Sequence, residues 1–167
     1  MATTIRGSDN WDSALTKSVA IIADVKPHNI DGGSAIANAW TVRDLNTKLD
    51  DPANIVTLAA NQFSLGIGTY LIEWAAPAFD INRHIARLYN VTDSVVSGVG
   101  TSTYASSAYS VMNYSTGARV VTLTSPKTFR IEHMAFSTVN TIGFGLDSNI
   151  VGTNSVYTTV KIHQIGV

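Results

Sequence analysis

The fold is decided by the stretch Phe63-Ser64-Leu65-Gly66-Ile67-Gly68-Thr69-Tyr70-Leu71-Ile72-Glu73-Trp74-Ala75-Ala76-Pro77-Ala78-Phe79-Asp80, which is soon followed by His84-Ile85-Ala86-Arg87-Leu88-Tyr89-Asn90. Both runs alternate with period two and are rich in aromatic and β-branched residues. Glycines and an Asn-Arg pair, which favour turns, separate the strand-like segments. We therefore predict neighbouring strands of an antiparallel sheet in an all-β protein. Glu73 and Arg87 are almost the only charges in these runs. Outer faces this apolar do not suit a sheet that meets water, so the pattern predicts a partner chain.

The composition indicates one domain with a nearly neutral surface rich in hydroxyl groups. The chain has 167 residues, of which 14% are charged, and a net charge of -1, whereas about 25% charged residues is usual. Lysine and arginine occur singly, so neither nucleic acid nor an anionic membrane is expected as a partner. There are no cysteines, which excludes disulfides. A secretory signal and an apolar run of about 20 residues are both missing, so we predict no membrane insertion.

The first part of the chain differs in composition from the rest. Residues 1–38 contain one short apolar run, residues 18–25, and end in turn-forming residues, so we predict an N-terminal attachment arm there. Residues 39–167 form the predicted domain. Its candidate strands are residues 40–45, 55–58, 62–65, 69–79, 84–90, 94–97, 118–124, 128–137, 143–146 and 155–165. Short, regularly spaced strands are typical of an antiparallel sandwich or jelly roll.

The order of several segments carries a resemblance. These segments are Trp40-Thr41-Val42-Arg43-Asp44-Leu45-Asn46-Thr47, Gln62-Phe63-Ser64-Leu65, Gly68-Thr69-Tyr70, Ala86-Arg87-Leu88-Tyr89-Asn90-Val91-Thr92, Lys127-Thr128-Phe129-Arg130-Ile131-Glu132-His133, Gly143-Phe144-Gly145 and Val156-Tyr157-Thr158-Thr159-Val160-Lys161-Ile162. The series resembles a bacteriophage and prophage domain of tail-fibre tips and small virion proteins, which is related to the trimeric jelly roll of the complement globular head and tumour necrosis factor. The resemblance covers residues 40–167. It implies a homotrimer in which the first, third, sixth and last strands form an inner sheet against the threefold axis.

Two of the strands show which side chains share a face. Tyr70, Ile72 and Trp74 alternate with a second set on the strand that holds them, so one set fills the core and the other faces a neighbour. The sequence leaves open which set does which. The candidates for core or trimer interface are Tyr70, Ile72, Trp74, Phe129, Tyr157 and Ile162.

No arrangement of residues indicates catalysis. The sequence has no Gly-x-Ser-x-Gly or His-Glu-x-x-His motif and no phosphate-binding glycine loop. Asp50-Asp51 precedes a proline and suits a turn. Glu132 and His133 are neighbours on a strand and point to opposite faces, which argues against an acid–base pair. We therefore predict no catalytic residue, and we expect a protein that is not an enzyme.

No cofactor or metal site is predicted either. The four histidines lack the spacing of metal ligands. A threefold axis could gather three copies of His133 or His163 around one ion, because zinc accepts three imidazoles, but we expect no such site.

The best candidate for a contact surface is the segment from residue 98 to residue 117. It mixes tyrosine with serine, threonine, asparagine and glycine, a composition suited to binding a polar ligand such as a host glycan or protein. The candidate contact residues are Tyr104, Tyr109, Asn113 and Tyr114. Alternatively, the tyrosines attach a long connection to the sheet.

Two functions follow from the resemblance. In the first, the protein is a trimeric tail-fibre or receptor-binding tip of a virion that attaches to the host cell surface, with its arm bound to another virion protein. In the second, it is a capsid decoration or head-fibre (collar) protein that stabilises the virion. In both, the protein is made in the host bacterial cytoplasm and resides in the virion. The tyrosine-rich segment favours the first.

Overall fold

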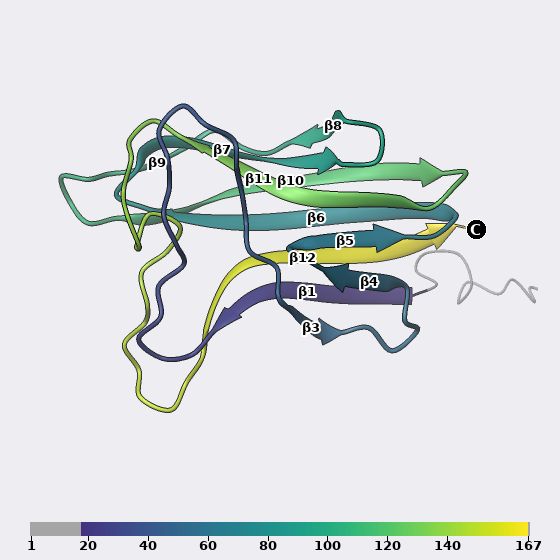
Figure 1. Cartoon of the computed structure of the whole chain (residues 1–167), viewed down its shortest axis with the longest axis horizontal. Coiled ribbons are helices and arrows are strands. Elements are labelled where there is room, and N and C mark those ends of the chain that lie inside the picture. Colours follow the sequence, from purple (N-terminus) through teal and green to yellow (C-terminus); the bar gives the residue numbers. More distant parts are fainter. Residues whose placement is uncertain (1–17, 167) are drawn as a thin grey trace, which may run out of the picture.

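The computed structural model describes residues 18–166, and this part of the chain consists of strands and loops without a helix. The strands form two antiparallel sheets packed face to face (Figure 1). Their bounds are β1 Ser18–Lys26, β2 Thr41–Val42, β3 Thr47–Asp50, β4 Val56–Ala59, β5 Gln62–Leu65, β6 Gly68–Phe79, β7 Asn82–Asn90, β8 Val95–Val99, β9 Thr103–Ala105, β10 Met112–Leu123, β11 Lys127–Ala135 and β12 Ser155–Gly166. The predicted all-β class and jelly-roll sandwich are confirmed.

Each sheet is built from strands that are distant in sequence. The five-stranded sheet has the order β10-β6-β12-β1-β3. The seven-stranded sheet has the order β4-β5-β11-β7-β8, with β2 beside β11 and β9 beside β7. The loops that follow β1, β9 and β11 gather at one end of the sandwich, on the left of Figure 1, whereas β1 begins and β12 finishes at the other end. We call the end with these loops the distal end.

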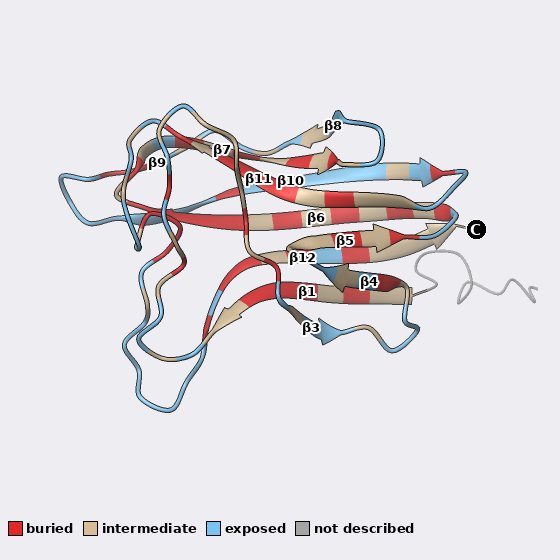
Figure 2. Cartoon of the chain, in the orientation of Figure 1, coloured by how far each residue is buried: buried red, intermediate tan, exposed pale blue. Residues whose placement is uncertain are grey.

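The core lies between the sheets and follows the alternation of side chains along the strands. On β6, Tyr70, Ile72 and Trp74 are buried, whereas the residues between them are only half-buried (Figure 2). Phe129 of β11 stacks on the ring of Phe63 with 5.7 Å between the centroids. The six side chains proposed for core or interface, Tyr70, Ile72, Trp74, Phe129, Tyr157 and Ile162, are each at most 3% exposed within a single protomer.

The predicted pairing of the two decisive runs is wrong. β6 and β7 belong to different sheets, because the chain crosses from one layer to the other at the turn between them. Asp80 and Asn82 take left-handed backbone angles there, with φ of 58° and 60°, which asparagine and aspartate tolerate better than most residues. Alternation indicates a strand with one buried face, but it does not identify the strand beside it.

The predicted boundary of the arm also needs correction. Residues 18–26 form β1, which pairs with β12 on one side and β3 on the other. Ala20 and Ile22 are fully buried, so the isolated apolar run of the sequence is an interior strand of the sheet. The part of the predicted arm before residue 18 lies outside the described residues. Among the other predicted strands, residues 143–146 are a loop, and the strand expected at residues 40–45 is reduced to β2 in the seven-stranded sheet.

One glycine on β10 allows the core to close around Trp74. A Cβ atom on Gly117 would lie 2.1 Å from Cζ2 of Trp74, a separation that no side chain tolerates. We expect Gly117→Ala to lower the free energy of unfolding by about 1–3 kcal/mol because the indole ring must shift. Gly66→Ala is the matched control, since a Cβ atom there meets nothing within 4 Å. Chemical denaturation of both variants measures the difference, and equal stability of the two would contradict the packing described here.

Candidate interaction surfaces

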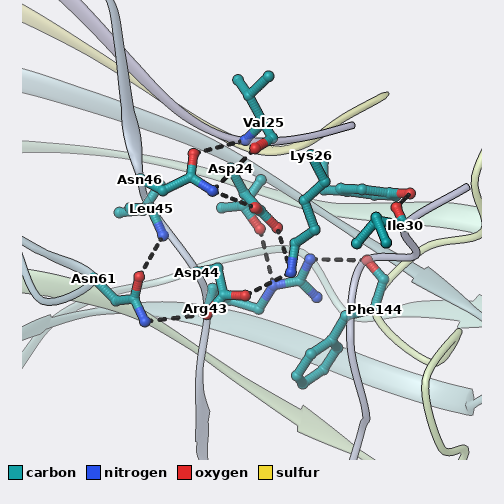
Figure 3. Close-up of polar contacts among 12 residues, drawn as sticks. Asp24, Val25, Lys26, Ile30, Arg43, Asp44, Leu45, Asn46, Asn61 and Phe144 are labelled. Carbon is teal, nitrogen blue, oxygen red and sulfur yellow. Dashed lines mark hydrogen bonds and ion pairs between the residues drawn. The ribbon is translucent and has the colours of Figure 1, made fainter. Parts of the chain in front are cut away.

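The interior holds a polar cluster centred on Arg43, in the connection between β2 and β3 (Figure 3). The side chain is fully buried, and burial lowers its pKa to about 9. Its Nε donates to Thr158 Oγ1 at 2.8 Å, and its Nη2 donates to the carbonyl of Phe144 at 2.9 Å. Nη1 donates to the carbonyl of Pro77 at 2.9 Å. These acceptors replace the lost water, as a buried guanidinium requires.

Carboxylates next to Arg43 attach the same connection to β1. Asp24 is fully buried, and Asn46 donates to it from Nδ2 at 3.2 Å. Lys26 Nζ lies 2.7 Å from Asp44 Oδ2 and 3.8 Å from Asp24 Oδ2. Burial raises the pKa of Asp24 to about 6, although the ammonium group of Lys26 opposes the rise. The connection is therefore held by charged contacts on one side and by backbone carbonyls on the other.

Two histidines extend the cluster toward β7. His133 Nδ1 lies 3.3 Å from Arg43 Nη1, and His133 Nε2 lies 2.9 Å from His84 Nδ1. A guanidinium can only donate, so His133 accepts at Nδ1 and carries its hydrogen on Nε2. His84 then accepts at Nδ1 and carries its hydrogen on the buried Nε2. Both rings are neutral, because burial and the charge of Arg43 lower the pKa of His133 and bring the pKa of His84 down to about 4.

This histidine pair should make folding sensitive to acid. An unfolded histidine titrates near 6.5, so the pair contributes its full stability above about pH 6.5, and this stability is lost as the pH falls toward 4. Because one pKa unit corresponds to about 1.4 kcal/mol, His84 alone accounts for about 3 kcal/mol. Asp24 has a raised pKa, so its protonation increases the free energy of unfolding as the pH falls below about 6. This single group opposes the two histidines. We expect the free energy of unfolding to decrease between about pH 6.5 and pH 4.5.

The matched variant for this prediction is His84→Asn, whose amide oxygen can accept the hydrogen of His133 without titrating. Urea unfolding measured across the pH range should give a flatter acid limb for the variant than for the native chain. A slope that is the same in both would show that the histidine pair is not the acid-sensitive group.

The outer face of the five-stranded sheet, opposite the core, is poor in charge. Glu73 and Lys161 lie in register on β6 and β12, and Glu73 Oε2 is 3.3 Å from His163 Nε2. A shallow hollow of about 460 Å³ lies beside them. With Tyr114 as an exception, most other side chains of β6, β10 and β12 on this face are small or aliphatic: Leu71, Ala75, Thr116, Ala118, Val120 and Thr159. This face agrees with the prediction from the sequence that an outer sheet face carries too few charges for a surface that meets water.

The residues proposed for ligand contact do not form one site. Tyr109 is 82% exposed in the loop between β9 and β10, at the distal end. Tyr104 lies on the outer face of the seven-stranded sheet, opposite Arg83 in the register of β7 and β9. Tyr114 lies on the outer face of the five-stranded sheet, opposite Pro77. Asn113 Nδ2 donates to the carbonyl of Tyr104 at 3.5 Å. Tyr104 and Tyr114 therefore point to opposite sides of the sandwich.

The outer face of the seven-stranded sheet carries a ladder of planar side chains that the sequence analysis missed. Arg87 lies over the Trp40 ring at 3.8 Å and over the Tyr89 ring at 5.2 Å, and Arg130 lies 5.0 Å from the Tyr89 centroid. Glu132 receives hydrogen bonds from Arg87 Nε at 2.6 Å and from Arg130 Nε at 2.8 Å. The alternation of β7 and β11 was visible in the sequence, but the stacking depends on their register.

The described residues contain no cluster of three or more histidine, cysteine or acidic side chains that could hold a metal ion. His133 is fully buried inside the protomer, so its copies cannot meet on a threefold axis, whereas His163 lies on the outer face of the five-stranded sheet. Between residues 18 and 166 no helix is long and apolar enough to cross a membrane.

Comparison with known proteins identifies the architecture. The sequence matches no protein-family model and no curated protein. The globular domain of zebrafish complement 1qA protein superposes with a TM-score of 0.55 at 17% identity, covering 89% of this chain and 98% of the other. The chain has the fold of the complement globular head. Within this complement-head fold, murine APRIL superposes with a TM-score of 0.53 at 9% identity over 88% of this chain and 98% of its own.

A viral protein shares the complement-head fold as well. PRD1 vertex protein P5 superposes with a TM-score of 0.55 at 12% identity, covering 90% of this chain and 98% of the other. The resemblance predicted from the sequence is thereby confirmed at the level of the fold.

Proposed function

We propose that this chain is a non-enzymatic bacteriophage virion protein that assembles as a homotrimer and attaches the particle to the host cell surface. The observation that carries the proposal is the contrast between its surfaces. The outer face of the five-stranded sheet is weakly charged and lined by small side chains, as a surface for a second copy requires. The distal loops expose aromatic side chains such as Tyr109.

The arrangement of the chain supports a projecting tip. Both ends of the described chain lie at the end of the sandwich opposite the distal loops (Figure 1). Attachment of the N-terminal segment to another virion protein would therefore direct the distal loops away from the particle. Three copies of one weak contact would reinforce one another in the trimer.

A second function is favoured by one comparison. PRD1 protein P5 is a vertex protein, and the same fold at a capsid vertex would suit a decoration or head-fibre protein that stabilises the particle. In that case the apolar sheet face would still form the trimer, but the distal loops would have no host ligand.

The trimer is tested by placing a charge on the proposed interface. Ala118→Glu adds a carboxylate directly opposite Glu73, on an exposed position of β10, so it should leave the protomer folded but dissociate the trimer. Thr57→Glu, on an exposed position of β4, is the control with the same change of charge. Light scattering should give three protomer masses for the native chain and the control, and one for Ala118→Glu. A native chain that is monomeric at micromolar concentration would refute the assembly.

The two functions are separated by two binding measurements on the purified trimer. A receptor-binding tip should adsorb to host cells and compete with the phage, and replacing Tyr104 and Tyr109 with alanine should reduce this adsorption without dissociating the trimer. A decoration protein should ignore cells and rebind particles from which it has been stripped. Saturable rebinding to the head with no adsorption to cells would end the receptor-binding proposal.

A further inference from the structure

A small hollow of about 310 Å³ is lined by residues from the start of β7, from β9 and from the end of β11. These parts of the strands lie near the distal end of the sandwich (Figure 1). The floor of the hollow is formed by the apolar side chains of Ile85 on β7 and Met134 on β11, which are half-buried. Arg83 and Phe136 stand at its rim, and both are exposed. The volume is near the lower limit for small-molecule sites, about 300 Å³. It suits one ring-sized unit.

Arg83 differs from the other arginines on the outer face of the seven-stranded sheet in having no carboxylate partner. Arg87 and Arg130 both pair with Glu132, whereas Arg83 forms no ion pair with any described residue. Its guanidinium lies over the ring of Phe136, with 5.6 Å between Cζ and the ring centroid. Tyr104 lies opposite Arg83 in the strand register. The hollow therefore presents a cation whose hydrogen-bond donors have no partner among residues 18–166.

The lining also includes Ala135 and the buried His84, and it is completed by polar residues at the edge. Ser102 carries a hydroxyl group and Asn38 an amide, whereas Thr103 lies opposite the inward-facing His84 in the strand register. Neither the Ser102 nor the Asn38 side chain makes a hydrogen bond within residues 18–166. They can donate to, or accept from, the hydroxyl groups of a bound molecule. Phe136 is 58% exposed, and an exposed aromatic ring next to an apolar floor accepts the C–H face of a ring.

We propose that this hollow binds an acidic monosaccharide unit, a hexose that carries a carboxylate, as part of a larger saccharide. The guanidinium fork of Arg83 matches a carboxylate with two parallel hydrogen bonds. The hydroxyl and amide groups bind the sugar hydroxyls, and the apolar floor with Phe136 takes the ring. A neutral hexose would leave the fork of Arg83 unmatched. The inference rests on the proposed function only in taking a host surface saccharide as the source of this unit.

Binding is tested by titrating the full native chain with glucuronic acid and following its backbone amide signals by NMR. Glucose serves as the uncharged control for glucuronic acid. Glucose 6-phosphate tests whether the hollow binds a sugar with any anionic group or requires a carboxylate. We expect signals of residues 83–85, 102–104 and 134–136 to shift with glucuronic acid, and at least about tenfold weaker binding of glucose, since charged hydrogen bonds are lost. Binding of glucose as strong as that of glucuronic acid, or binding of the phosphate alone, would overturn the assignment of a carboxylate.

The role of Arg83 in binding is tested with two variants, each of which loses one positive charge. Arg83→Gln should weaken glucuronic acid binding by at least about tenfold, whereas Arg119→Gln, an exposed position on β10 outside the hollow, should leave it unchanged. Phe136→Ala should weaken binding as well, and thermal unfolding of each variant verifies the fold. Equal affinity of Arg83→Gln and the native chain would refute the site.

Cell adsorption separates a failure of this site from a failure of the proposed function. If the trimer adsorbs to host cells and Arg83→Gln adsorbs equally well, the site is wrong and receptor binding stands. If glucuronic acid binds at Arg83 but the trimer does not adsorb to cells, the site stands and receptor binding is wrong.

Discussion

The buried charge of Arg43 is the constraint on which the rest of the structure depends. A guanidinium removed from water is costly unless every donor finds an acceptor. Here the acceptors are Thr158 of β12, the carbonyls of Pro77 on β6 and Phe144 in the loop after β11, and His133 of β11. These groups come from both sheets, so the cation is satisfied only when the sheets and the loop are all in place. The cluster therefore specifies one arrangement of the distal half of the sandwich.

The interior has two kinds of core as a consequence. One end is packed by aromatic and aliphatic side chains, as in the stacking of Phe63 on Phe129. The distal end contains the charged and imidazole groups around Arg43, with small apolar residues such as Ala35 and Ala78 beside them. The hydrogen-bonded cluster positions the strand ends that carry Arg83 and Phe136. A site on such strand ends is held more rigidly than one on loops alone.

The two outer faces of the sandwich differ in chemistry. The five-stranded sheet presents small side chains with few charges, whereas the seven-stranded sheet presents three arginines among aromatic rings. In the proposed trimer the first face is buried against other copies and the second faces the solvent. Self-association and ligand binding would then use separate surfaces, so a substitution on one need not disturb the other.

The sequence by itself determined the all-β class, the alternation that places Tyr70, Ile72 and Trp74 on one face of their strand, and the shortage of charge on β6, because these depend on the local period of side chains. It also indicated Tyr104, beside the hollow at Arg83. Only the tertiary structure decided that the face with Tyr70 is the buried one, that β6 and β7 lie in different sheets and that residues 18–26 form an interior strand. The same holds for Arg43, which sequence composition would place at the surface. Strand partners and buried ion clusters depend on contacts between residues far apart in the chain, and no local pattern records those contacts.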